Sequence, residues 1–254
     1  MSNILRRSLA GALVFLGLAL PAAAQQKYLR VVATTTWTAA FARAAGIEEV
    51  ITLAPADLRH PAEYELKASD VAALKDADMI ISTGFEVMAK RLGEAAGSQK
   101  IRILQIGADY SLATMRSSLL AIAEAAGTMP QARASIAALE EFMASWKEEL
   151  RARGLTGSAI LVHLFQKPLM GELGFTVKGV FGPAPLEAAQ IARLSKEKVS
   201  FIVDNWHNEV AAPLRETLPG ARSTSLINFP GPDGTVTLLD VLADNRNRLA
   251  AAAP

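Results

Sequence analysis

The order of apolar patterns along the chain constrains its fold more than any other feature. Short apolar or β-branched runs of strand length alternate with segments in which apolar residues recur every three or four positions. In the first half the strand-like runs are residues 28–34, 50–53, 79–82 and 101–106. A helix between consecutive strands is what parallel pairing requires, so we predict a parallel sheet covered by helices.

The same alternation returns after a stretch of helix-forming residues. Between Ser117 and Arg153 apolar side chains recur at helical spacing, and Pro130 predicts a kink or a division of this helical segment. Strand-like runs then resume at residues 159–163, 176–181, 199–203 and 223–227. We therefore predict an α/β protein with two parallel-sheet lobes and flanking helices, joined by a long spine helix, with a ligand cleft between the lobes.

The beginning of the chain has the pattern of a secretory signal peptide. Arg6 and Arg7 precede an apolar stretch at residues 9–20, and small alanines follow up to Ala24. We expect cleavage near Ala24 and export to the periplasm, without a lipid anchor because the chain has no cysteine. The expected organisation is residues 1–24 as signal peptide, 25–116 as first lobe, 117–154 as spine and 155–254 as second lobe.

Composition excludes several classes of function. With 26 Lys and Arg against 25 Asp and Glu, the chain lacks the basic surface of a nucleic-acid-binding protein. Without cysteine it has no disulfide, no thiolate nucleophile and no thiolate metal site. It also lacks a Gly-x-Ser-x-Gly elbow, a His-Glu-x-x-His helix and a phosphate loop. We therefore do not expect an enzyme, and a metal-dependent periplasmic enzyme is only a minor alternative.

The three histidines of the chain follow predicted strands. His60, His163 and His207 lie where ligands bind in open α/β sheets, beyond the carboxyl ends of the strands. They come from both halves, so a cleft between lobes would bring them together. Neutral imidazole binds divalent transition metals, and a carboxylate completes such sites. Asp204 is the nearest carboxylate in sequence, and further ones near strand ends are Glu63, Glu65 and Glu86.

A second interpretation of these positions stays open. A single histidine is more often a surface or hydrogen-bonded residue than a metal ligand, and loops are rich in polar residues in any case. The cleft would then bind an organic molecule, with Asn205 and Asn228 forming hydrogen bonds and Trp206 stacking on it. Trp37 is a further candidate for the cleft wall.

Several short motifs resemble one family. They are Val31-Val32-Ala33-Thr34, Tyr64-Glu65 followed by Ser69-Asp70-Val71, Ile160 to His163 with Gly174 eleven residues later, Phe201 to Asp204, and Ser225 to Gly231. Together they resemble the zinc- and manganese-binding solute-binding proteins of ABC importers, over nearly the whole chain after the leader. The resemblance implies a monomeric receptor that carries a metal ion or small ligand to the membrane permease of an ABC importer.

The resemblance carries the family's metal ligands over only in part. The family's third metal ligand matches His163. The position of the family's first ligand is occupied here by Ala62, and His60 lies two residues earlier. The family's second metal ligand has no counterpart, because residues 107–112 contain no histidine. The position of its fourth ligand is occupied here by Asn228. The chain therefore departs from the family's pattern at three of four ligand positions.

Two hypotheses follow for the ligand. The metal site is rebuilt from His60, His163 and His207 with Asp204 or a nearby glutamate, with zinc as the first candidate and manganese, iron or copper as the others. Alternatively, the cleft takes a metal chelate or a small organic molecule. If histidines hold the ion, its affinity is expected to fall below a pH of about 6.5, because imidazole must be neutral to coordinate.

Overall fold

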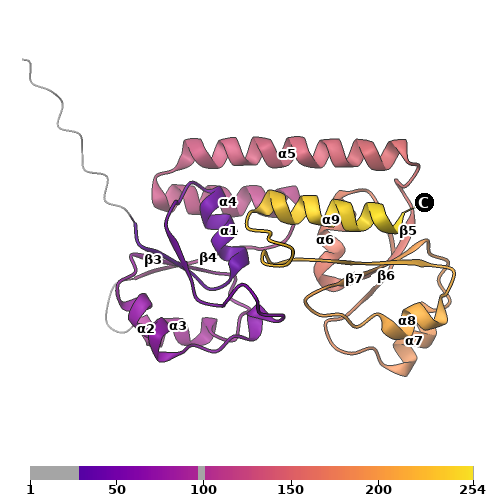
Figure 1. Cartoon of the computed structure of the whole chain (residues 1–254), viewed down its shortest axis with the longest axis horizontal. Coiled ribbons are helices and arrows are strands. Elements are labelled where there is room, and N and C mark those ends of the chain that lie inside the picture. The colour runs from indigo at the N-terminus through magenta and orange to yellow at the C-terminus, as the bar shows by residue number, and fades with distance from the viewer. Residues whose placement is uncertain (1–28, 97–100, 254) are drawn as a thin grey trace, which may run out of the picture.

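The computed structural model describes residues 29–96 and 101–253, so the expected signal peptide lies outside the described residues. Two four-stranded parallel sheets lie side by side, and one long helix runs along both of them (Figure 1). None of the described helices is both long and apolar enough to cross a membrane. The predicted fold class, two parallel-sheet lobes joined by a helical spine, is confirmed.

The first lobe is a sheet between two layers of helices. Its strands have the order β2-β1-β3-β4. Val32 and Ile80 pack with α2 and α3 on one face, while Val31 and Ile81 face the main core on the other. The elements are β1 (Val31–Ala33), α1 (Thr36–Ala44), β2 (Val50–Thr52), α2 (Ala68–Lys75), β3 (Met79–Ser82), α3 (Ala89–Ala96) and β4 (Arg102–Gln105).

The start of α2 is fixed by an aspartate. The helix begins at Ala68, one residue before Ser69, and Lys67 is its N-cap residue. Asp70 stabilises this end, because its carboxylate accepts hydrogen bonds from the Lys67 N–H at 2.8 Å and the Tyr64 hydroxyl at 2.9 Å. Ser69 therefore lies in the first turn and does not cap the helix.

The second lobe repeats this arrangement. Its strands have the order β6-β5-β7-β8, the same order as in the first lobe. Leu161 and Ile202 pack under α7 and α8, and Ile160 and Val203 face the main core. The elements are β5 (Ala159–His163), α6 (Lys167–Glu172), β6 (Thr176–Phe181), α7 (Ala188–Leu194), β7 (Phe201–Asn205), α8 (Ala212–Thr217), β8 (Arg222–Leu226) and α9 (Leu238–Ala252).

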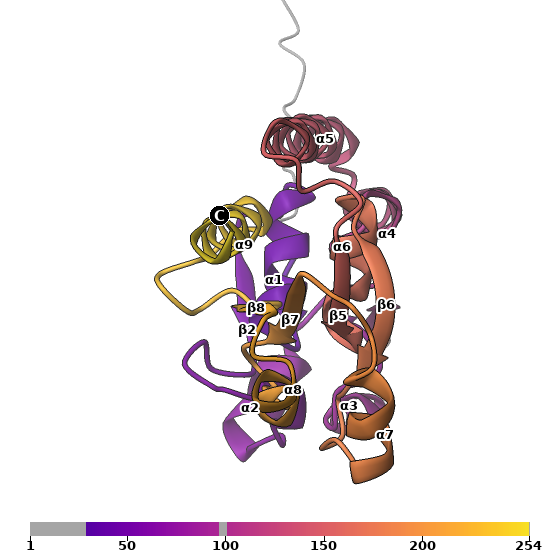
Figure 2. The same ribbon diagram turned by 90° about the vertical axis from the view of Figure 1, so that its right-hand side faces the viewer.

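The helical middle of the chain is divided into two helices. α4 (Leu112–Ala126) ends at Gly127, which has a left-handed φ of 74°, and α5 (Met129–Ala152) then turns back over it. Pro130 lies in the first turn of α5, where a residue without an N–H fits, so it starts a helix and does not kink one. Figure 2 shows α5 on the outside of the molecule, above α4 and α9.

The two lobes share one hydrophobic core. The largest buried cluster contains residues of both sheets together with α5 side chains such as Trp146. Hydrogen bonds also cross between the lobes: for example, the Tyr110 hydroxyl donates to the Asn228 carbonyl at 2.8 Å, and the Thr36 hydroxyl donates to the Pro230 carbonyl at 2.7 Å. Because separating the lobes would expose this core, we expect ligand binding to move loops and not whole lobes.

Gly231 provides a test of the packing between the lobes. Its φ is 140°, and a Cβ there would overlap the backbone oxygen of Ala56 in the first lobe. We expect Gly231→Ala to lower the free energy of unfolding by about 2 kcal/mol, through steric overlap and backbone strain. Chemical denaturation measures this loss. Gly234→Ala is the control, since Gly234 also has a positive φ but no atom within 4 Å of the added Cβ. Equal losses would exclude the contact with Ala56 as the cause.

Candidate metal site

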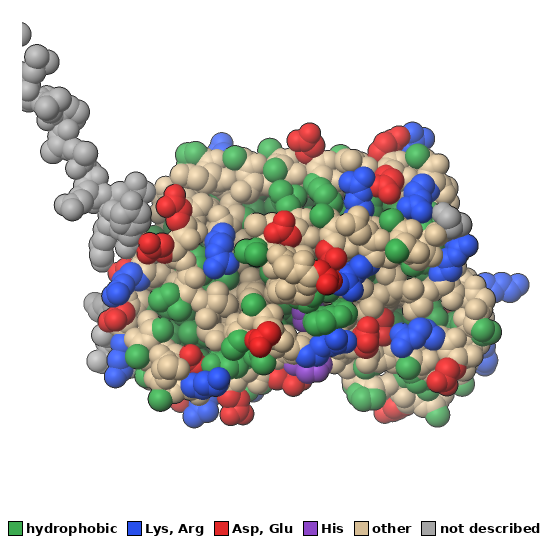
Figure 3. Space-filling model, in the orientation of Figure 1, with side chains coloured by type: hydrophobic (Ala, Val, Ile, Leu, Met, Phe, Trp, Pro, Cys, Tyr) green, Lys and Arg blue, Asp and Glu red, His purple; other side chains and the backbone are tan. Residues whose placement is uncertain are grey.

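A cavity of about 360 Å³ lies between the lobes. It is lined by the segments that follow all eight strands, for example by Trp37 after β1, His60 after β2 and Pro183 after β6. Histidine side chains reach the surface where the two lobes meet (Figure 3). The cavity therefore lies at the carboxyl ends of both sheets, where ligands bind in open α/β folds.

Much of the cavity wall is apolar. The Trp37 indole stacks on Tyr110, with ring centroids 5.5 Å apart, and meets the edge of Phe229 at 5.2 Å. Phe85 of the first lobe and Phe165 of the second lie on the same cavity and are 56% and 43% exposed. Trp37 therefore lines the cavity while its ring packs in the aromatic core, and the two phenylalanines were not predicted as site residues.

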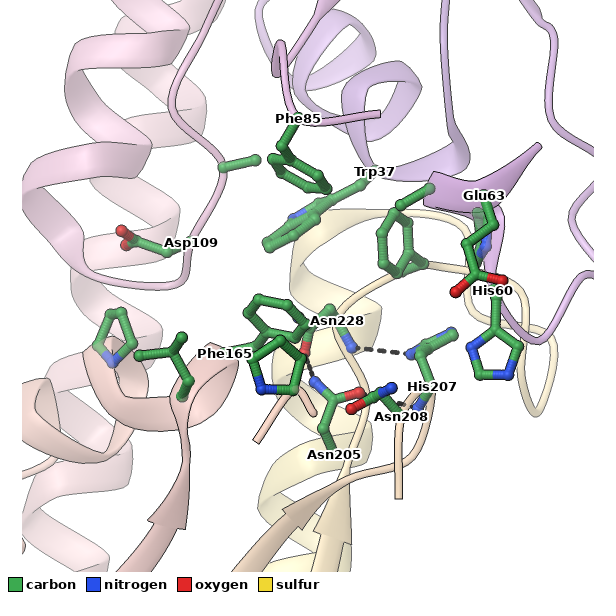
Figure 4. A pocket seen from close by; sticks show the side chains of 17 residues that line it. Trp37, His60, Glu63, Phe85, Asp109, Phe165, Asn205, His207, Asn208 and Asn228 are labelled. Atoms are coloured by element: carbon green, nitrogen blue, oxygen red, sulfur yellow. Dashed lines mark hydrogen bonds between the residues drawn. The ribbon is translucent and has the colours of Figure 1, made fainter. Parts of the chain in front are cut away.

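Side-chain amides form the polar floor of the cavity. Asn228 Oδ1 accepts hydrogen bonds from Asn205 Nδ2 at 2.7 Å and from Gln166 Nε2. Asn205 Oδ1 in turn accepts the backbone N–H of His207 at 2.9 Å. Asn205 and Asn228 thus line the cavity, and a hydrogen bond between their neutral amides links them (Figure 4).

His207 lines the cavity and is uncharged at neutral pH. Burial, followed by the positive charges of Arg59, His60 and Arg248, lowers the pKa of His207 to about 3. Its Nδ1 accepts the Asn228 N–H at 3.4 Å, so the proton of the neutral ring is on Nε2. His207 does not titrate near pH 6.5, and the expected loss of affinity at that pH does not apply to this residue.

His163 lies behind the cavity and does not line it. The ring is fully buried, and burial lowers its pKa. Its Nδ1 accepts the Phe165 N–H at 3.1 Å, and Nε2 is 3.1 Å from Oδ1 of Asn208, which lines the cavity. Both ring nitrogens are therefore used to hold the loops after β5 and β7.

Asp204 is directed away from the cavity. Its buried carboxylate accepts the backbone N–H groups of Asn205 at 2.9 Å and Ala211 at 2.8 Å, with Val210 at 3.4 Å and the Arg215 guanidinium at 3.5 Å. These bonds hold the loop that leads into α8. In this arrangement Asp204 supports the site without facing it.

Carboxylates and imidazoles lie on two sides of the cavity. Figure 4 shows the Glu63 carboxylate and the rings of His60 and His207 on one side, and Asp109 on the opposite side. His60 and Glu63 are exposed at the rim. Asp109 binds Ser111 and Thr114 at the start of α4. Sequence reasoning missed Asp109, although it follows β4 at the same edge as the histidines.

The other candidates lie outside the cavity lining. Glu65 is exposed, and Trp206 is half-buried beside His207, with the Arg59 guanidinium 3.9 Å from its ring centre. Arg59 also pairs with Glu209 at 3.3 Å, so this contact joins the lobes. Glu86 is buried and accepts the Thr34 hydroxyl at 2.6 Å.

The predicted four-residue metal set is not brought together. Of its members, His60 and His207 line the cavity, while His163 lies behind it and Asp204 faces α8. Within residues 29–96 and 101–253, no three His, Asp or Glu side chains are close enough together to hold a metal ion. The cavity itself offers two imidazoles, two carboxylates, neutral amides and aromatic walls.

Two like sheets, a helical spine and a cavity at the carboxyl ends of all strands define the fold of a solute-binding protein. More particularly, the chain has the fold of metal-binding members of this class. The sequence itself matches no protein-family model and no curated protein.

Three solved structures illustrate this likeness. FpvC from Pseudomonas aeruginosa, in complex with Mn²⁺, has a TM-score of 0.71 at 19% identity over 89% of this chain and 98% of its own. AdcAII from Streptococcus pneumoniae has 0.71 at 17% identity over 90% and 100%. The Mn-bound periplasmic metal-binding protein from Candidatus Liberibacter asiaticus has 0.66 at 16% identity over 87% and 98%. The fold implied by the sequence resemblance is thereby confirmed.

Proposed function

We propose that this protein is the periplasmic solute-binding receptor of an ABC importer, and that its cargo contains a divalent transition metal. One observation carries the proposal: a cavity lined by His60, Glu63 and His207 from opposite lobes, in a fold shared with proteins solved in complex with Mn²⁺ and Ni²⁺. Zinc is the first candidate, since imidazole and carboxylate are among its preferred ligands, and manganese, iron and copper are alternatives.

The side chains have different roles in this proposal. His60, Glu63 and His207 face the cargo, whereas His163 and Asp204 hold the loops after β5 and β7 in position. Because the lobes share one core, binding orders the rim loops of a monomer. The permease then distinguishes the loaded receptor from the empty one by those loops, since the cargo contacts them only when bound. This is a binding role and not a catalytic one.

Metal analysis of the exported protein tests the proposal. We expect close to one transition-metal ion per protein after gel filtration, because the cavity forms a single site. A His60→Ala/His207→Ala double variant should lose most of this metal, since it removes both imidazoles of the cavity. Plasma mass spectrometry measures the content.

The control is Glu94→Ala, which removes an exposed carboxylate of α3 that does not line the cavity. This variant should keep its metal. Absence of any transition metal from the folded wild-type protein, both as isolated and after incubation with metal salts and metal complexes, would contradict the proposed function.

A further inference from the structure

We infer that the metal enters this cleft as a complex with a small organic chelator, and not as a bare ion. The inference rests on the proposed function of the cleft as the site of a metal-containing cargo. It follows from three features of the cavity: its size, its apolar walls and the incomplete set of metal ligands that it offers.

The size of the cavity fits an organic molecule. A volume of about 360 Å³ falls in the range of small-molecule pockets, roughly 300–1,000 Å³. A bare zinc ion lies only about 2 Å from each of its ligands, so its protein ligands must converge on one point. Here His60 and Glu63 lie at the rim and Asp109 lies on the opposite side of the cavity (Figure 4).

The walls present apolar surface from both lobes. Phe85 of the first lobe, and Leu164 and Phe165 of the second, line the cavity and are 56%, 43% and 43% exposed. Large apolar side chains left open to water on facing sides of one cavity are typical of a binding site whose ligand covers them. A hydrated or bare ion gains nothing from such contacts, whereas the flat face of an aromatic chelator stacks on phenylalanine.

The polar groups are suited to the edge of a chelator. Nδ1 of His207 already accepts the Asn228 N–H, so the ring offers the cavity an N–H donor and not a free lone pair. The nearby amides of Asn205 and Asn228 are neutral and bonded to each other. With so few free ligands on the protein, the chelator supplies most of the metal's coordination shell, and the protein recognises the chelator.

A comparison of bare and complexed metal tests this inference. The metal-free protein would be titrated by calorimetry with zinc chloride, and then with one-to-one zinc complexes of 1,10-phenanthroline, 2,2′-bipyridine, 8-hydroxyquinoline and picolinate. We expect at least one complex to bind ten times more tightly than zinc alone. Phe165→Ala and Phe85→Ala should each weaken that complex by about tenfold, and leave the binding of bare zinc unchanged.

Ile103→Ala is the matched control. Ile103 is 44% exposed, close to the 43% of Phe165, but does not line the cavity, so this variant should bind the complex as the wild type does. The chelator inference would be overturned if bare zinc bound as tightly as every complex, or if neither phenylalanine variant affected the binding of the complex. Either result would leave the proposed function standing. If no complex binds while bare zinc does, the inference is likewise wrong. Failure of both forms of metal to bind would reject the inference and the proposed function together.

Discussion

Replacing Asp204 with alanine is expected to lower the free energy of unfolding by about 3 kcal/mol, because buried backbone donors would lose their acceptor. The carboxylate accepts the N–H groups of Asn205, Val210 and Ala211 in the loop between β7 and α8. Alanine leaves the buried donors of Asn205 and Ala211 without partners. Denaturant titration of the metal-free protein measures the loss, which corresponds to a decrease in melting temperature of about 6–12 °C.

Two further variants separate the roles of the carboxylate. Asp204→Asn keeps Oδ1 for Asn205 and Val210 but turns an amide N–H₂ toward Ala211, so an intermediate loss is expected. Arg215→Ala removes only a 3.5 Å ion pair made by a 41% exposed side chain, and should cost less than about 1 kcal/mol. If Asp204→Ala left the stability of the metal-free protein unchanged but abolished metal binding, Asp204 would be a metal ligand, as the sequence suggested.

The stability of the metal-free protein is expected to depend on pH through His207. Its pKa is about 3 in the folded protein, against 6.5 as the ordinary value, so the unfolded chain binds a proton over this range that the folded protein does not. Stability is therefore fully present above pH 6.5 and decreases as the pH falls toward 3. The loss is about 1.4 kcal/mol per pH unit, or roughly 3 kcal/mol between pH 6.5 and pH 4.

His207→Gln isolates this contribution. Glutamine does not titrate, so the variant should lose less stability than the wild type between pH 6.5 and pH 4, while the carboxylates contribute equally to both proteins. His60→Gln is the matched control: it leaves unchanged the burial that is the largest cause of the low pKa of His207, so its stability should still decrease with falling pH much as that of the wild type does. Parallel stability curves for the wild type and His207→Gln, measured by denaturant titration, would contradict a neutral buried ring.

The sequence was sufficient for the fold because each element carries its own local signal. β-branched runs, helical periodicity and turn residues place the strand ends to within three residues, and alternating strands and helices permit little except parallel sheets. The helical middle was placed less well, since the periodicity begins before Ser117 and Gly127, not Pro130, marks the break. A glycine at the end of a helix takes a left-handed φ without strain, so Gly127 in the sequence already indicated the end of a helix.

The candidate site was only partly predictable. Of the residues named as candidates beyond the carboxyl ends of the strands, His60, His207, Asn205 and Asn228 line the cavity, and His163 does not. The rule that ligands bind at the carboxyl ends of strands applied equally to Asp109, Phe85 and Phe165, which were not selected because a search for metal ligands favours histidine and passes over aromatic residues.

By itself, the sequence determined the two parallel-sheet lobes, the helical spine and the edge at which the ligand cavity lies. Only the tertiary structure decided which way each polar side chain at that edge faces. His163 and Asp204 follow strands as His207 does, yet their polar atoms are used by neighbouring loops. The physical reason is that a buried polar group must find a hydrogen-bond partner, and the nearest partner depends on how loops distant in sequence pack together.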